Sequence, residues 1–529
     1  MGARRRIGWC RLAVLVGVAV GLLILRPAGM SAAKRTVPAG GDLQAALDAA
    51  QPGDIVELAP GAVYSGNFVL PLKGQGSAFI TVRSAPDPAL PREGERIQPS
   101  HAPLLAKLRS PNGRPALATA PRAHHWRLEL LEFQSNAGGS GDIMTLGDGS
   151  RAQNALDQVP HDLIVDRCYV HGDVEVGQKR GIALNTAATT ISGSYISDIK
   201  AVGQDTQAIA AWNGPGPFTI TNNYLEAAAE NVIFGGSDPS IRNLVPSDIT
   251  FTHNLLSRPV SWRRERWQFK NILELKNARR ATITGNVLEN NWLGAQVGFA
   301  VLFTVRNQDG QCPWCQVEQV VFEGNVVQHS SGGVKILGYD DGGESQQTRG
   351  ITIRGNLFAD IDNTRWGGTG YFLLLVGNPR DIVIDHNTVI QEHGDGILQV
   401  EGPPILGFVF TNNITRHNAY GIKGANRGIG SDTISAFFPT SRVTNNVMAD
   451  GDAARYSAGN YFPSSAEFRR QFIAYDQGDF RLVPSSAWSH ASTTGTALGA
   501  HISAIAAGRP ATEPDEPTRP RPSKGRPLR

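Results

Sequence analysis

The chain has 529 residues, 41% of them hydrophobic, which suffices for several ordinary domains or for one long solenoid. Its formal net charge of +3 produces no overall field that would require a nucleic-acid partner, and we expect none. With 59 glycines and few long helical patterns, the composition favours a turn-rich all-β chain.

The first 33 residues have the pattern of a signal peptide. Three arginines at 4–6 precede an apolar run at 12–25, and small residues follow at 31–33. This order of basic, apolar and small residues is typical of a cleaved export signal. We therefore predict a secreted, periplasmic or envelope protein with no membrane contact beyond this segment. An uncleaved anchor is the alternative.

The segment after the signal predicts a cap for the start of the fold. Residues 42–50 (DLQAALDAA) form a short amphipathic pattern with Asp42 as a plausible N-cap. Such a helix would cover the open end of a stack of strands and prevent edge-to-edge aggregation. Residues 86–125 are rich in proline and are predicted to be a loop excursion.

A short turn pattern then recurs along the chain, as in ITGNVL and VIDHNTVI. Successive copies are 26 to 39 residues apart, and each period also contains a second short apolar strand. Cys168 and Ser194 fill the central slot in the first two copies. In the later copies this slot is occupied by Asn223, Asn254, Asn286, Asn325, Asn356, Asn387, Asn413 and Asn446.

This period predicts an all-β, right-handed parallel β-helix of about ten coils over residues 34–507, with the N-terminal helix as its cap. A single coil cannot bury its apolar face, but coils stacked about 4.8 Å apart can. The asparagine amides would then donate and accept along the axis as a ladder. Residues 508–529 are rich in Pro and Arg and are predicted to be disordered. We expect a monomer.

Cys312 and Cys315 form a CPWC motif. In an oxidising compartment, a local disulfide is the favoured interpretation. Thioredoxin-like redox chemistry needs a βαβ context, and zinc needs two further ligands. These two alternatives stay open. Cys168 is expected to be a small buried hydrophobe.

The opening TVPAGGDLQAALDAAQPGDIVELAPG, followed by the asparagine-turn coils, resembles the pectin-lyase-like superfamily of right-handed β-helices from about residue 36 to about 500. The resemblance implies the fold. It does not imply one reaction, because this fold is used by lyases, hydrolases, epimerases and adhesins.

A more local resemblance concerns ILELKNARRATITGN, followed one coil later by VLFTVRNQDG. These segments are similar to the chondroitinase B and alginate lyase group, which carries a catalytic Lys in one coil and a catalytic Arg in the next. The resemblance implies that Lys276 and Arg306 are catalytic. That group also binds calcium through acidic residues before the Lys, where only Glu274 is near, and the spacing from Lys276 to Asn286 is one residue longer.

The residues themselves point to the same pair. Side chains alternate along a strand, so Lys276 and Arg306 are expected to face outward. If Asn277 and Asn307 stack, the two cations would lie about 5 Å apart. Cleavage of a uronic acid polymer by elimination needs neutralisation of the carboxylate, a base for the α-proton, and an acid for the leaving oxygen. Lys276 could be the base, and Arg306 could stabilise the carboxylate or the enolate.

A simpler interpretation is that both cations form surface ion pairs. Lys276 would then pair with Glu274 or Glu289, and Arg306 with Asp309. Solvent-exposed pairs of this kind are common and carry no function by themselves.

Further candidates surround the pair. We predict that Glu274, Arg242, Lys335 and Trp292 contact substrate. Asp340 and Asp341 could bind calcium, or could act as a hydrolase carboxylate pair, with a solvated loop as the alternative. The basic segment 258–270 (RPVSWRRERWQFK) would attract an anionic polymer.

Three functions are compatible with these sequence features. The favoured one is a polysaccharide lyase that acts on an acidic polysaccharide by β-elimination, with calcium as a possible cofactor. The second is a glycoside hydrolase of the same fold. The third is a non-catalytic carbohydrate-binding or structural envelope protein.

Overall fold

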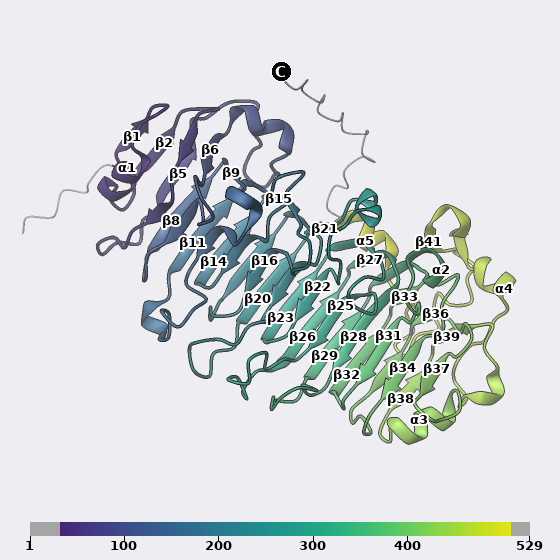
Figure 1. The fold of residues 1–529 in the computed structure, drawn as a ribbon. Coiled ribbons are helices and arrows are strands. Elements are labelled where there is room, and N and C mark those ends of the chain that lie inside the picture. Colours follow the sequence, from purple (N-terminus) through teal and green to yellow (C-terminus); the bar gives the residue numbers. More distant parts are fainter. Residues whose placement is uncertain (1–31, 509–529) are drawn as a thin grey trace, which may run out of the picture.

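The chain winds into a long stack of coils whose walls are three sheets (Figure 1). The computed structural model describes residues 32–508. The first sheet has 14 strands, from β1 (Lys34–Val37) to β38 (Arg442–Thr444), and the third has 13, from β3 (Val63–Ser65) to β39 (Val447–Ala449). Neighbouring strands of these sheets pair in parallel, as in β20 (Ser247–Thr252) with β23 (Ala278–Thr284).

The second sheet carries the candidate site and has 12 strands. In chain order they are β4 (Phe68–Leu70), β7 (Leu117–Thr119), β10 (Asp142–Leu146), β13 (Arg180–Leu184), β16 (Gln207–Ala211), β19 (Glu230–Phe234), β22 (Leu273–Leu275), β25 (Phe299–Thr304), β28 (Gly332–Leu337), β31 (Leu373–Val376), β34 (Leu398–Glu401) and β37 (Ile422–Gly424). Each strand of this sheet is one rung, and consecutive rungs come from consecutive coils.

The predicted parallel β-helix is confirmed, but the stack is longer than ten coils. The difference lies near the N-terminus, where the coils lack the asparagine turn. The predicted loop over residues 86–125 contains β6 (Ala106–Arg109), β7 and the start of β8 (His124–Glu129). The loop itself therefore ends by residue 105, and the asparagine motif undercounts the coils because it begins only at residue 168.

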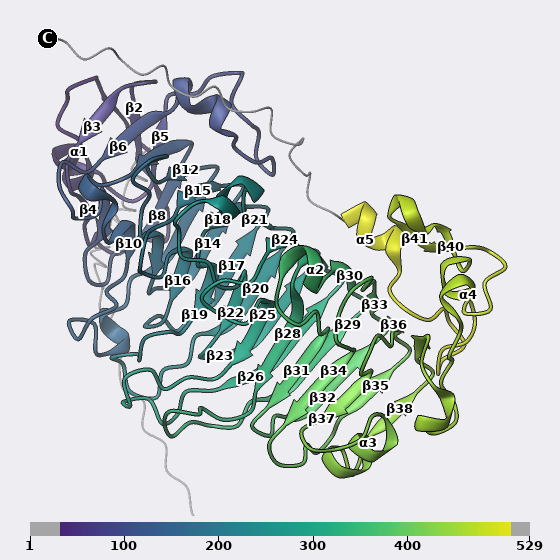
Figure 2. The ribbon, with the colours of Figure 1, turned by 45° about the vertical axis from the view of Figure 1, so that its right-hand side comes forward.

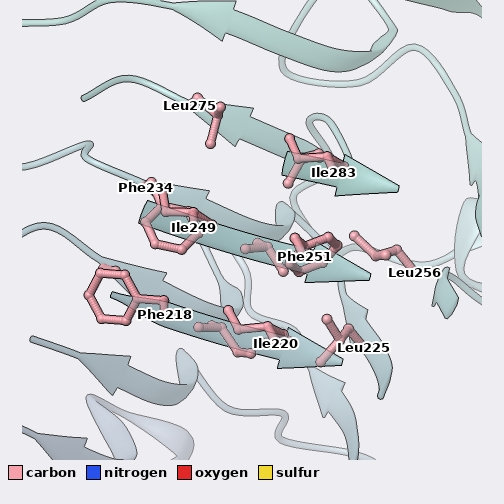
Figure 3. Packing of buried hydrophobic residues seen from close by; sticks show 14 of the residues in the cluster. Phe218, Ile220, Leu225, Phe234, Ile249, Phe251, Leu256, Leu275 and Ile283 are labelled. Carbon is pink, nitrogen blue, oxygen red and sulfur yellow. The ribbon is translucent and has the colours of Figure 1, made fainter. Parts of the chain in front are cut away.

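The core fills the inside of the stack with rows of equivalent side chains (Figure 3). Phe218 and Ile220 of β17 (Phe218–Thr221) lie beneath Ile249 and Phe251 of β20, with which they pair in register. The other two sheets contribute residues such as Phe234 to the same interior. Each large apolar side chain buried in this way stabilises the fold by about 1.5–3 kcal/mol.

The predicted asparagine ladder is present. From Asn223 to Asn446, each side-chain Nδ2 donates to the Oδ1 of the next asparagine over 2.9 to 3.1 Å. The row starts where the Cys168 N–H donates to Ser194 Oγ (3.0 Å) and continues to Asn460, which the sequence pattern did not mark. The asparagines are therefore structural, and they point into the interior.

Both ends of the stack are covered (Figure 2). Helix α1 (Leu43–Ala49) closes the N-terminal end with Leu43 and Leu47 in the core, and the carboxylate of Asp42 accepts the Ala45 N–H over 2.9 Å. At the other end, α3 (Ser431–Phe437) packs on β37 and buries Phe437. The predicted N-cap and capping helix are thus confirmed.

Residues 1–31 of the proposed signal peptide and residues 509–529 of the predicted C-terminal tail lie outside the described residues. Within residues 32–508, the structure contains no helix that combines the length and apolarity needed to span a membrane.

Candidate functional site

Lys276 and Arg306 follow neighbouring rungs of the second sheet. β22 and β25 pair in parallel, with Leu273 opposite Val301. Lys276 comes directly after β22, and the Arg306 N–H donates to the Lys276 carbonyl over 3.0 Å. The two cations therefore come from adjacent coils at the same edge of the sheet, as the sequence predicted.

The two asparagines that follow Lys276 and Arg306 make different contacts from those expected. Asn277 and Asn307 are not joined by a hydrogen bond of the kind that links the asparagine ladder, because their side-chain oxygens accept from other residues. Asn277 Oδ1 accepts the Gln316 N–H (3.2 Å), and Asn307 Oδ1 accepts the Cys312 N–H (2.7 Å). Both amides instead bind the loop between β25 and β26 (Val317–Glu323), and the backbone hydrogen bond between Arg306 and Lys276 sets the register of the two cations.

Both cations line a cationic groove with a volume of about 780 Å³ on the outside of the second sheet. One carboxylate, Asp205, and one large aromatic side chain, Trp212, also line it, within the part of the chain that the structure describes. Guanidinium and ammonium groups are the donors that a ligand with carboxylates would need. The cations that line the groove are Lys179, Arg180, Lys270, Lys276 and Arg306.

Arg306 is held in place by two carboxylates from the loop after β28. Its Nη1 donates to Asp340 Oδ1 and to Asp341 Oδ1, both at 2.6 Å. The Asp340 side chain is fully buried and also accepts the Asn307 N–H (2.6 Å), whereas Asp341 is exposed. The pairing with Asp309 that the sequence suggested is replaced by this clamp, and the Arg306 side chain remains 30% exposed toward the groove.

The residues present do not fit a calcium site at this clamp. The guanidinium of Arg306 already lies against both Asp340 and Asp341. Within residues 32–508, no group of three or more His, Cys, Asp or Glu side chains is arranged to hold a metal ion. Asp340 instead positions Arg306.

Lys276 has the ion pair that the simpler interpretation suggested, and it still reaches the groove. Its Nζ lies 3.7 Å from Glu274 Oε1, and its side chain is 15% exposed. Glu274 accepts a hydrogen bond from the Thr304 hydroxyl (3.1 Å) and is itself buried. Glu274 was predicted to contact substrate, but the structure places it beneath the groove surface.

Glu230 lies beside Glu274 under the groove, and both are only 1% exposed. Burial and the neighbouring Glu274 carboxylate raise the pKa of Glu230 to about 7. Two groups act against this shift. The ammonium of Lys270 lies 3.3 Å from Glu230 Oε1, and Gln207 Nε2 donates to its Oε2 over 2.9 Å.

A raised pKa in the folded state makes stability depend on pH. The carboxyl has a reference value of 4.5, so ionisation is disfavoured in the folded state, and stability falls as pH rises from about 4.5 through about 7. Glu230→Gln removes this loss, which is up to about 3 kcal/mol. We expect the thermal midpoint of the variant, minus that of the native protein, to increase from pH 5 to pH 8. The exposed control Glu175→Gln should show no such trend, and a difference independent of pH would contradict the assignment.

The other predicted contact residues lie outside the groove lining. Trp292 is 2% exposed and packs on Phe269, with 4.9 Å between ring centroids. Arg242 is exposed on the loop after β19, and Lys335 lies on β28 next to Leu302. Neither cation belongs to the lining of the groove.

The basic segment 258–270 contributes only one residue to the groove. Arg258 is buried and donates to the Ala227 carbonyl and to Asn291 Oδ1, both at 2.9 Å. Burial lowers its pKa to about 9. Lys270 is the residue of this segment that lines the groove.

Two groove residues could have been found from the sequence by comparing positions within rungs. Trp212 directly follows β16 just as Lys276 directly follows β22. Arg180 starts β13, and its guanidinium lies 5.0 Å from the centre of the Trp212 ring. Aligning the ends of the second strand in every coil would have grouped Trp212 with Lys276.

The disulfide between Cys312 and Cys315 is formed, with a Cα–Cα distance of 5.3 Å. It lies in the loop after β25, where the Cys312 N–H binds Asn307 next to Arg306. Cys168 is a buried free cysteine, and burial raises the pKa of its thiol to about 12.

No protein-family profile matches this chain, and no curated protein does. Among solved structures, the chain is similar to the PL6 family alginate lyase AlyGC, at 15% identity and a TM-score of 0.52 over 88% of this chain and 58% of that one. It is also similar to the GH87 alpha-1,3-glucanase from Streptomyces thermodiastaticus, at 15% identity and a TM-score of 0.49 over 83% and 71%. A third is the PL6 family lyase Pedsa3628 from Pseudopedobacter saltans, at 10% identity and a TM-score of 0.41 over 88% and 100%.

At these identities the comparison establishes the fold, which is a right-handed parallel β-helix of the kind found in polysaccharide lyases. This chain spans 58% of the length of AlyGC.

Proposed function

We propose that the protein is a polysaccharide lyase that cleaves an acidic polysaccharide by β-elimination in the cationic groove. The observation that supports this proposal is that Lys276 and Arg306 directly follow neighbouring rungs and both line a groove with five cations and one carboxylate among its described residues. A uronic acid polymer supplies the negative charges that such a lining attracts.

The reaction uses the two cations in different roles. Arg306, held by Asp340, stabilises the negative charge that develops on the sugar carboxylate as the C5 proton leaves. Lys276 in its neutral form takes that proton. The electron pair forms the C4=C5 double bond, and the glycosidic oxygen leaves C4 with the proton returned by the Lys276 ammonium.

Hydrolysis is the less favoured reaction on chemical grounds. Retaining and inverting glycosidases place two carboxyl groups on either side of the scissile bond. Of the described residues that line the groove, only Asp205 has a carboxylate. Glu230 and Glu274 lie buried beneath the surface, where they cannot flank a sugar.

The test is a panel digest of alginate, chondroitin and pectate, with a neutral glucan as control. We expect ultraviolet absorbance from the new C4=C5 bond to increase with at least one acidic polymer and not with the glucan. New reducing ends without absorbance would favour a hydrolase. Binding without either signal would favour a non-catalytic carbohydrate-binding protein.

A further inference from the structure

The groove continues along the axis of the stack well beyond Lys276. Its lining includes Arg180 on β13, Trp212 directly after β16, Lys276 directly after β22 and Arg306 after β25. These strands belong to five successive rungs, from β13 to β25, which together cover about 19 Å along the axis. A chain-like ligand that fills the groove therefore reaches Arg180 at the same time as Lys276.

An open position separates Trp212 from Lys276. Trp212, Gly235 and Lys276 directly follow three neighbouring strands whose last residues pair in register. The rung between the indole and the ammonium therefore has no side chain at this place. A Cβ on Gly235 would lie only 2.9 Å from Lys276 Cβ, so a larger residue would not fit without a shift. The space over Gly235 joins the reactive pair to the part of the groove at Trp212 and Arg180.

Arg180 is fixed beside Trp212 by three contacts. Its Nη1 donates to Asp142 Oδ1 (2.8 Å), its Nε donates to Gln207 Oε1 (3.1 Å), and its guanidinium carbon lies 5.0 Å from the centre of the Trp212 ring. The indole N–H of Trp212 donates in turn to the Gly149 carbonyl over 2.9 Å. A guanidinium that is already ordered in this way loses little freedom when it binds a ligand.

The same guanidinium still has donors for a ligand. Its Nε and Nη1 are bound to protein groups, and its Nη2 carries two further N–H donors. The Arg180 side chain is 17% exposed and lines the groove. Ala210 and Ile233 line the groove as well, and they offer apolar surface to a sugar ring. A carboxylate attached to a sugar ring is the ligand that matches these groups.

We propose that Arg180, held in place by Trp212, forms a second binding site for a carboxylate of the polymer, so that the uronic acid chain lies along the axis from Lys276 toward the N-terminal end of the groove. This inference deepens the proposed function and rests on it. It narrows the substrate class to linear polymers that carry carboxylates on more than one sugar. Arg180 binds substrate in this proposal, and Trp212 is a positioning residue.

The first experiment measures binding without cleavage. Hexasaccharides of alginate and of pectate are titrated by calorimetry into Lys276→Ala and into the double variant Lys276→Ala with Arg180→Ala. The second substitution should weaken binding of at least one hexasaccharide about 10- to 100-fold, because it removes a charge-assisted hydrogen bond. Arg349→Ala in the same background is the matched control. Arg349 is an exposed arginine of β29 (Arg349–Arg354) in the first sheet, where it pairs with Glu318, and its loss should leave the affinity unchanged.

The second experiment uses a polymer that the native protein cleaves, together with its oligosaccharides of increasing length. Arg180→Ala should raise KM for the polymer about 10- to 100-fold and change kcat by less than about threefold, because the contact is the same in the ground state and the transition state. Native kcat/KM should rise with chain length until the chain reaches Arg180, and the variant should lose this rise. Trp212→Ala should act in the same direction.

The fold of each variant is checked by its thermal midpoint. Arg180→Lys replaces the alanine variant if that one does not fold, since it keeps a positive charge for Asp142 but lacks the guanidinium fork, and it should weaken hexasaccharide binding about 3- to 10-fold.

Three results would overturn the proposal. Unchanged hexasaccharide affinity in the folded double variant would exclude the second site while leaving the lyase function in place. An equal loss of kcat/KM for the shortest and the longest substrates would show that Arg180 only supports the structure. If the native protein neither binds nor cleaves any of the acidic polymers, the proposed function and the second site are both wrong.

Discussion

If the proposed reaction is correct, Lys276→Ala is expected to lower kcat/KM for cleavage of the acidic polymer by about 10³-fold, because it removes the group proposed to take the C5 proton. Folding should be retained, since Lys276 is partly exposed and its partner Glu274 keeps the hydrogen bond from Thr304. The measurement is the initial rate of double-bond formation at several substrate concentrations. Lys423→Ala on β37 is the control and should keep the native rate.

A loss that appears only in KM would contradict this role, because a base acts on the chemical step. Lys276→Arg sharpens the test. It keeps the positive charge but cannot act as a base at neutral pH, so it should be as inactive as the alanine variant. Substantial activity in Lys276→Arg would mean that the side chain only attracts substrate.

The role of Arg306 has to be tested with a double variant, because Arg306 also forms an ion pair with Asp340. Arg306→Ala removes the ion pair of the buried Asp340 carboxylate, which keeps the hydrogen bonds from the Asn307 and Gly342 N–H groups, so we expect a loss of about 1–3 kcal/mol. The double variant Arg306→Ala with Asp340→Asn removes that charge. We expect the double variant to recover stability and to remain inactive, which separates catalysis from folding. Recovery of activity together with stability would exclude Arg306 from the reaction.

The largest effect on stability is expected at the middle of the asparagine ladder. Asn325 is fully buried and donates to the Ile283 carbonyl (2.9 Å) and to Asn356 Oδ1 (3.1 Å). Its Oδ1 accepts the backbone N–H and the Nδ2 of Asn286, both at 2.9 Å. Asn325→Ala leaves several of these buried groups unpaired, at about 1–3 kcal/mol each, so we expect a total loss of about 4 kcal/mol. Urea unfolding measures it.

Asn460→Ala provides the matched comparison at the end of the same ladder. Asn460 also accepts from Asn446, but it is partly exposed, so water can replace the lost bonds. We expect less than half the destabilisation seen for Asn325→Ala. Equal effects at the two positions would show that burial of the ladder is not what makes it stabilising.

The fold could be predicted because an asparagine recurs at the same turn of most coils. Each asparagine marks one turn, and each turn implies a rung that pairs with the next. The coils before Cys168 escaped this reasoning because their turns use other residues. Proline-rich residues 86–105 do form a loop, but nothing in the sequence after them showed that β6 and β7 resume the stack.

Only those groove residues that directly follow a strand of the second sheet could be predicted from the sequence. Lys276 and Arg306 were placed correctly because side-chain alternation fixes which face they use. The clamp of Arg306 was not, because Asp340 reaches it from a loop more than thirty residues later in the sequence. Trp292 is the opposite case, because it was predicted to contact substrate but is buried. An aromatic residue near a site can stack on a sugar or pack under a loop, and only its neighbours decide which.

The groove also lies well inside the stack, with consequences for how the protein tolerates damage. β22 and β25 are the seventh and eighth of the 12 rungs of the second sheet, counted from the N-terminal cap. In a stack where each coil contacts only its neighbours, local opening starts at the ends, where it costs least. Heat or proteolysis that erodes the terminal coils would therefore leave the groove around Lys276 and Arg306 assembled, and the proposed activity should outlast a measurable loss of overall structure.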